Sequence, residues 1–127
     1  LCRSMGKVAV HVADRPGFAT SRINAMIGNE AFYMLMEGVA SAEDIDVSMK
    51  LALNHPMGPF ELVDLVGLDT RLSVLRRLHD GLGDKFRPCP LLVSLVEAGR
   101  LGRKTGQGVY RYDEKGDRIP GSAADLR

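Results

Sequence analysis

The stretch that most constrains this fold is residues 14–38, where a proline–glycine break precedes a long helix-compatible run. Proline fixes φ and biases the preceding residue toward extended geometry, so Pro16 and Gly17 predict a stop before the helix. Gly38 is placed to end it. Apolar side chains at helical spacing form two stripes: Ala19, Ile23, Met26, Ile27, Ala31 and Met34 on one, and Phe18, Ala25, Phe32 and Met36 on the other. A helix with two apolar sides is predicted to be central and buried on both.

Polar and small residues interrupt these stripes. Glu30 falls inside the first stripe, and a carboxylate among apolar side chains needs a partner or stays protonated. We expect a structural ion pair or a helix-end contact there. Ser21, Ala25 and Gly28 are small and lie close together on the second stripe, so another backbone or a ligand can approach them.

Shorter helices are predicted to pack around this central one. Ser41 is a good N-cap, Pro59 suits the first position of a helix, and Asp69 is expected to cap the helix that follows. The expected helices run over about 42–53, from Pro59 to Gly67, from Asp69 to Gly81 or Gly83, and from Pro90 to Gly99.

The two ends of the chain differ from this helical pattern. Val8, Val10 and Val12 alternate with other residues over 7–13, which predicts a strand, while residues 1–6 read as a helix tail. A strand needs neighbours for its backbone hydrogen bonds, so it should pair with a part of the protein missing here, or with another copy. The abrupt opening suggests a fragment or a processed product. Residues 113–127 are polar and are expected to be mobile.

Composition narrows the class of protein. The 127 residues suit one domain with a single core, and a net charge of +1 gives no electrostatic reason to expect nucleic acid or an anionic membrane as the partner. No apolar run approaches the length of a membrane span. Cys2 and Cys89 lie far apart and are expected to be reduced thiols in the cytoplasm. We expect Cys89 to be a buried structural thiol rather than a reactive one.

The chain has stretches that look like cofactor-binding or metal-binding motifs, but each lacks the residues, spacing or neighbouring structure that such a site requires. Residues 99–105 look like a P-loop, but Arg103 separates the glycine from the lysine, and a helix precedes the motif. Residues 81–83 lack the third glycine of a dinucleotide-binding turn. The histidines His11, His55 and His79 have no metal-ligand spacing. No cofactor-binding or metal-binding residue is therefore assigned within the chain.

Six motifs in a fixed order point to a family. They are DRPGF at 14–18, NEA at 29–31, EDID at 43–46, HPMGPFEL at 55–62, GLD at 67–69 and GRKTGQGVY at 102–110. Together they resemble the C-terminal domain of the 3-hydroxyacyl-CoA dehydrogenases, particularly the bacterial 3-hydroxybutyryl-CoA dehydrogenases. The resemblance runs from about residue 7 to residue 112.

The resemblance implies an all-α fold, the helical C-terminal domain of the 6-phosphogluconate-dehydrogenase-like type, preceded by one orphan strand from a missing Rossmann domain. Residues 1–13 would be the remnant of that domain, 14–112 the helical substrate and dimerisation domain, and 113–127 a mobile polar tail. The whole enzyme would oxidise an (S)-3-hydroxyacyl-CoA, such as 3-hydroxybutyryl-CoA, to the 3-oxoacyl-CoA. The missing domain would bind NAD or NADP and carry a catalytic histidine–glutamate pair, so this chain alone would be inactive.

The resemblance also implies roles for single residues. After the Pro-Gly-Phe turn, many members have an Asn-Arg pair whose asparagine helps to position the reacting oxygen of the substrate, and here the pair is Ser21-Arg22. Ser21 would take that role, with Met57 and Phe60 forming part of the acyl-pocket wall. His55 does not stand where the family keeps its base. The implied partners are an acyl-CoA and a second copy of the chain in a homodimer.

Two other interpretations fit the same residues. A sibling hydroxyacid dehydrogenase with the same domain plan would act on a sugar acid without CoA, and the substrate profile of the full-length protein separates the two. A helical module that only dimerises would need no Rossmann partner. An upstream dinucleotide-binding turn would exclude that module.

Overall fold

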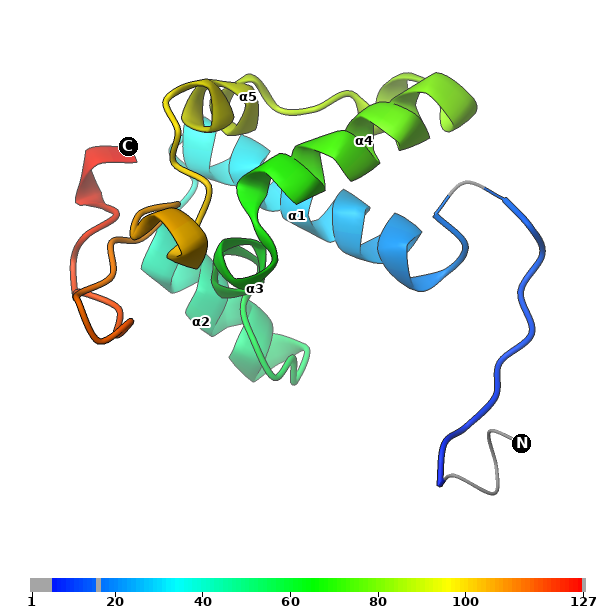
Figure 1. Ribbon diagram of the computed structural model, residues 1–127, viewed down its shortest axis with the longest axis horizontal. Coiled ribbons are helices and arrows are strands. Elements are labelled where there is room, and N and C mark those ends of the chain that lie inside the picture. The colour runs from blue at the N-terminus through cyan, green and yellow to red at the C-terminus, as the bar shows by residue number, and fades with distance from the viewer. Residues whose placement is uncertain (1–5, 16, 127) are drawn as a thin grey trace.

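The computed structural model describes residues 6–15 and 17–126, and in this part of the chain the regular structure is helical (Figure 1). The α-helices are α1 (Thr20–Met36), α2 (Ala42–Ala52), α3 (Pro59–Val66), α4 (Leu68–Leu82) and α5 (Pro90–Glu97). A short 3₁₀ turn at Asp84–Phe86 lies between α4 and α5, and two more follow α5 at Arg103–Thr105 and Ala124–Leu126. Helix α1 contacts α3, α4 and α5, and α2 packs on α3. The predicted all-α class is confirmed.

Local signals explain most of the helix boundaries. The Ser41 hydroxyl accepts a hydrogen bond from the backbone N–H of Asp44 at 3.2 Å, which caps α2 as predicted. Gly67 ends α3 with a positive φ of 113° and is also the residue before α4. The prediction that Asp69 caps α4 is wrong, because α4 begins at Leu68 and Asp69 already lies in its first turn. The Asp69 carboxylate instead pairs with Lys104 at 2.7 Å.

The core lies on one side of α1. Phe32 and Phe60 are fully buried and meet edge to face, with ring centroids 5.2 Å apart. The prediction that α1 is buried on two sides is wrong for this chain, because Ile23 is 60% exposed and Met26 is 36% exposed. Helices α3, α4 and α5 cover the side that carries Ala25 and Phe32, and the first half of the first apolar stripe (Ala19, Ile23 and Met26) stays at the surface.

A buried carboxylate, Asp46, holds the start of α3. Its Oδ1 accepts from the backbone N–H of Phe60 at 2.8 Å, and its Oδ2 accepts from Glu61 N–H at 3.1 Å and from the Tyr110 hydroxyl at 2.6 Å. A Cβ on Gly58 would lie 2.4 Å from the Asp46 side chain, so this position needs glycine. Desolvation by burial raises the pKa of Asp46 to about 6, although the Tyr110 hydrogen bond opposes the shift.

A second buried carboxylate, Asp64 on α3, fastens the segment after α5. Its Oδ1 accepts from the backbone N–H of Val109 at 2.8 Å, and its Oδ2 accepts from Tyr110 N–H at 3.0 Å and from the Tyr112 hydroxyl at 2.6 Å. The two aspartates therefore tie residues 109–112 to α2 and α3 without a sheet. Residues 109–112 make only isolated β-bridges among the described residues.

The segment before the first helix forms no strand in the described part of the chain. Residues 7–13 run away from the helical body (Figure 1), and Val8 and Val10 are 89% and 78% exposed. The predicted strand is therefore not formed here, because no neighbouring strand satisfies its backbone. Its pairing with a further domain stays a prediction. The expected helix tail falls mostly on residues 1–5, which lie outside the described residues.

The polar segment after residue 112 has specific contacts with the helical body. The backbone N–H of Gly121 donates to Glu43 at 3.1 Å, and Arg100 pairs with Asp125 at 3.0 Å. Ala123 is buried. The expected mobility of this tail stays a prediction, but these contacts argue for a docked rather than a free segment. No helix in the described residues is long and apolar enough to cross a bilayer.

Candidate functional site

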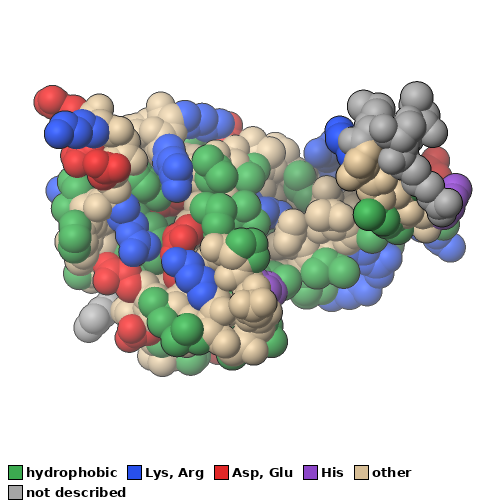
Figure 2. Space-filling model, turned by 90° about the horizontal axis from the view of Figure 1, so that it is seen from below, with side chains coloured by type: hydrophobic (Ala, Val, Ile, Leu, Met, Phe, Trp, Pro, Cys, Tyr) green, Lys and Arg blue, Asp and Glu red, His purple; other side chains and the backbone are tan. Residues whose placement is uncertain are grey.

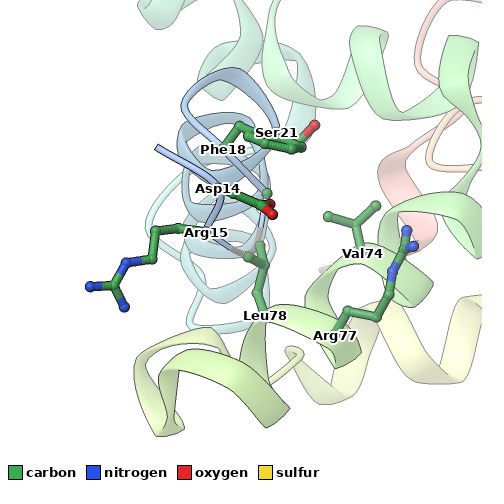
Figure 3. A pocket seen from close by; sticks show the side chains of 8 residues that line it. Asp14, Arg15, Phe18, Ser21, Val74, Arg77 and Leu78 are labelled. Carbon is green, nitrogen blue, oxygen red and sulfur yellow. The ribbon is translucent and has the colours of Figure 1, made fainter. Parts of the chain in front are cut away.

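A hollow of about 590 Å³ lies between the start of α1 and the middle of α4 (Figure 3). Its lining residues are Asp14, Arg15, Gly17, Phe18, Ser21, Val74, Arg77 and Leu78. The structure therefore places Ser21, the residue expected to position the substrate, at the wall of a surface hollow. Asp14 and Arg15 border the hollow directly after residues 7–13, which leave the helical body in Figure 1.

The turn before α1 sets the position of Ser21. Gly17 has a φ of +75°, and a Cβ there would lie 2.9 Å from a methyl group of Leu78, so glycine is required for both conformation and closeness to α4. Phe18 also has a positive φ, of 48°, which is uncommon for a bulky residue. The backbone N–H of Arg22 donates to the Gly17 carbonyl at 3.2 Å, which starts the helix beside the hollow.

The charged groups of the hollow do not form a catalytic pair. In Figure 3 the Asp14 carboxylate points toward the space beside Val74, Arg77 lies on the far side, and the Arg15 guanidinium points away. No histidine lines the hollow, and His55 lies on the turn between α2 and α3. A serine hydroxyl donates one hydrogen bond and accepts others. The hollow can therefore orient a polar substrate group, but it offers no histidine base.

A second hollow of about 230 Å³ continues along the same two helices. It is lined by Ser21, Asn24, Val66, Thr70, Arg71 and Val74, so Ser21 and Val74 border both hollows. Arg71 is buried, and its Nε atom has no hydrogen-bond partner among the residues that the structure describes. Sequence reasoning missed Arg71. The spacing along the sequence could have indicated that Arg71 is buried, because it lies on the same face of α4 as the apolar Leu68 and Leu75.

The two residues expected at the acyl-pocket wall do not join Ser21. Phe60 is fully buried against Phe32 in the core, and its expected role in the acyl-pocket wall stays a prediction. Met57 is half-buried on the turn before α3 and lines neither hollow. The sequence placed both residues in one motif with a rigid turn, but that motif serves the packing of α3 on α1 and α2.

Glu30 lies at the surface, not in a buried ion pair. It lines a shallow groove of about 270 Å³ with Met26, Ile27, Ala31, Met34, Met49 and Pro59. Glu30 is exposed, and no ion pair joins it to another residue of the described ranges. The expected partner is therefore not found within the described chain.

Cys89 is a structural thiol, as predicted. It is fully buried, and desolvation raises the pKa of its thiol. Its backbone N–H donates to the Asn29 side chain at 2.8 Å, and the Asn29 amide donates to the Arg87 carbonyl at 2.8 Å. Cys2 lies outside the described residues. Over residues 6–15 and 17–126, no three His, Cys, Asp or Glu side chains gather as a metal site.

Comparison with known proteins gives a consistent result. Residues 17–112 match the family model described as "3-hydroxyacyl-CoA dehydrogenase, C-terminal domain". A probable 3-hydroxybutyryl-CoA dehydrogenase of Bacillus subtilis is 56% identical over 116 residues, which cover 91% of this chain and 40% of the relative. A 3-hydroxybutyryl-CoA dehydrogenase of Bradyrhizobium diazoefficiens is 55% identical over 109 residues, covering 85% of this chain and 37% of the relative.

Solved structures agree in fold. The crystal structure of (S)-3-hydroxybutyryl-CoA dehydrogenase PaaH1 from Ralstonia eutropha matches with a TM-score of 0.84 at 49% identity, over 88% of this chain and 40% of that protein. The chain thus spans about 40% of the length of the B. subtilis relative. The family-model match covers most of the chain, and the helical fold agrees with it. The chain belongs to the 3-hydroxyacyl-CoA dehydrogenase family, and it corresponds to the C-terminal domain of that family.

Proposed function

We propose that this chain is the helical domain of an enzyme that interconverts (S)-3-hydroxybutyryl-CoA and acetoacetyl-CoA with a nicotinamide cofactor, NAD or NADP. The observation that carries the proposal is the hollow beside Ser21, at the end of the domain where residues 7–13 depart. The similar proteins named 3-hydroxybutyryl-CoA dehydrogenases support the substrate. The same names favour an acyl-CoA over a sugar acid as the substrate.

The described residues do not fit the nicotinamide cofactor. They contain no strand followed by a glycine turn and a helix, and no histidine borders the hollow. We therefore assign cofactor binding and proton transfer to an N-terminal domain of which residues 1–13 are the last part. In this division, residues 1–13 belong to that domain, residues 14–112 close the substrate cleft, and residues 113–127 follow as a tail. A cytoplasmic location accords with the free thiol of Cys89.

Ser21 would hold the substrate oxygen at C3. Its side chain stands at the first turn of α1, and its hydroxyl can donate a hydrogen bond to that oxygen as negative charge develops there. The Ser21 hydroxyl orients the substrate and supplies a dipole. The proton of the substrate hydroxyl goes to a base outside this chain. Met57 remains a proposed acyl contact only if a further domain brings the substrate to the turn before α3.

Exposed apolar side chains support a homodimer through the helical domain. Ile23 and Met26 on α1 are exposed, and so are Val47 and Leu51 on α2. Figure 2 shows hydrophobic side chains reaching the surface in several groups on the face that it presents. Contiguous exposed apolar surface commonly marks an interface. We propose that a second copy covers the outer side of α1.

The test of the proposed site is Ser21→Ala in the full-length enzyme. Loss of one hydrogen-bond donor to a developing oxyanion typically lowers kcat by about 100-fold, and we expect a loss of about 10- to 100-fold here because the hydroxyl is exposed. Ser21→Asn should restore part of the rate because the amide also donates. Ser48→Ala, which changes an exposed serine on α2, is the matched control. Unchanged kcat and KM in Ser21→Ala would remove Ser21 from the site.

A further inference from the structure

A buried guanidinium on α4 has no partner in the described part of the chain. Arg71 is only 7% exposed, its Nε atom is buried without a hydrogen bond, and no ion pair reaches it from another described residue. A buried charge is costly unless an opposite charge or hydrogen bonds compensate it. Burial accordingly lowers the pKa of Arg71. Such a group is expected to have a partner of negative charge.

The surroundings of Arg71 leave space for that partner. The 230 Å³ hollow brings Ser21 and Asn24 of α1 toward Thr70 and Arg71 of α4, and no acidic side chain lines it. On the α1 side, Gly28 faces this side chain, because a Cβ built on Gly28 would lie 3.6 Å from the Arg71 Nε, at ordinary van der Waals distance.

The neighbouring acid is already engaged. Asp69 lies two residues before Arg71 on the same helix, but its carboxylate pairs with Lys104 at 2.7 Å. Hydrogen bonding to Lys104 lowers the pKa of Asp69, in agreement with an ion pair. The charge on Arg71 is therefore left for a group that enters the hollow from outside.

We propose that Arg71, with Ser21, Asn24 and Thr70, forms a binding site for a carboxylate group. The planar guanidinium matches the two oxygens of a carboxylate, and two hydroxyls and an amide supply further hydrogen bonds around it. The hollow is too small for a large ligand but admits the end of one. The carboxylate comes either from the far end of an acyl substrate or from an acidic side chain of a preceding domain. The first source rests on the proposed function, with Ser21 holding the C3 oxygen, and it requires an acyl-CoA that ends in a carboxylate, because 3-hydroxybutyryl-CoA ends in a methyl group.

Binding of glutarate to the 127-residue chain tests the site without any catalysis. We expect saturable binding by isothermal titration calorimetry at constant ionic strength, and a rise in melting temperature that sodium chloride does not give. Arg71→Met should weaken glutarate binding at least about tenfold, because the charged hydrogen bonds are lost. Arg71→Lys should bind with intermediate affinity, since an ammonium is a single point charge. Arg76→Met, at an exposed arginine of the same helix, is the matched control and should bind as the wild type does.

A second variant keeps the test independent of folding defects. Asn24→Asp is close in size and would place a carboxylate in the hollow, so it should raise the melting temperature and abolish glutarate binding. Arg71→Met should also melt at or above the wild-type temperature without glutarate, because an uncompensated buried charge is removed. Equal glutarate affinity in wild type and Arg71→Met, or no saturable binding by the wild-type chain, would overturn the site.

The same titration in the full-length protein separates the two sources. Glutarate binding that persists there, and that Arg71→Met removes, identifies the site as one for a carboxyl-ended substrate. If glutarate no longer binds and Arg71→Met lowers the melting temperature, an acidic side chain of the preceding domain occupies the site. If Arg71→Met changes neither glutarate binding nor the melting temperature of the full-length protein, the proposed carboxylate site is wrong. Because no readout here is an activity, a failure of the proposed dehydrogenase function would be seen separately.

Discussion

Single polar residues carry much of what is distinctive in this domain. Asp46 and Asp64 are almost fully buried, and each accepts two backbone N–H groups and one tyrosine hydroxyl. Hydrogen bonds compensate the loss of hydration only in part, so burial raises the pKa of both carboxyls. These residues connect distant parts of the chain, and their titration should be visible in the stability of the domain.

The first prediction concerns pH and Asp46. A pKa of about 6 in the folded state, against 3.8 as the ordinary value, means that the folded chain binds this proton more tightly. Its stabilising effect is fully present below pH about 4 and is lost as the pH rises through about 6. The free energy of unfolding should therefore fall by up to about 3 kcal/mol from this group between those values.

Urea unfolding at a series of pH values checks this prediction. The difference in unfolding free energy between wild type and Asp46→Asn should shrink as the pH rises from about 4 to about 6, because the variant lacks the titrating group. Asp44→Asn, at an exposed carboxyl of the same helix, is the matched control variant and is measured over the same pH series. A difference that stays constant across this range would show that Asp46 does not titrate there.

Local sequence signals determine where each helix begins and ends, whereas tertiary contacts determine which of its faces is buried. Ser41, Pro59 and Gly67 mark boundaries that the structure confirms, because capping and φ preferences act within a few residues. Our prediction that α1 is buried on both sides was wrong, since periodicity shows that a face is apolar but does not show what covers it. The docking of 109–112 onto Asp64, and the burial of Arg71, depend on contacts between segments distant in sequence and were not predicted.

The helix cap at α2 gives a prediction at this scale. Ser41→Ala removes the side-chain oxygen that accepts from Asp44 N–H, and should lower the free energy of unfolding by about 1 kcal/mol. Ser41→Asp should retain most of the stability because aspartate is also a good N-cap. Ser73→Ala, at an exposed serine within α4, is the control in urea unfolding. Equal losses in Ser41→Ala and Ser73→Ala would show that the cap is not stabilising.

At the scale of the whole molecule, the domain leaves apolar surface and a polar hollow facing outward. If a second copy covers the outer side of α1, Ile23→Glu should convert a dimer to a monomer, because a buried charge at the interface is costly. Sedimentation velocity measures the change. Ser73→Glu, on the exposed surface of α4, should keep the oligomeric state of the wild type. A wild-type chain that is monomeric at all concentrations would contradict the proposed dimer.

The central claim is that this helical domain completes a 3-hydroxyacyl-CoA dehydrogenase together with a nucleotide-binding domain that precedes it. The most direct measurement is the oxidation of NADH or NADPH with acetoacetyl-CoA, made on the product of the complete gene and on this chain alone, with the intact mass of each. The account predicts a full-length protein about 2.3 times the length of this chain, because 116 aligned residues make up 40% of the B. subtilis relative, with activity in that protein and none in the chain. A complete product of only this length, without activity, would contradict the claim.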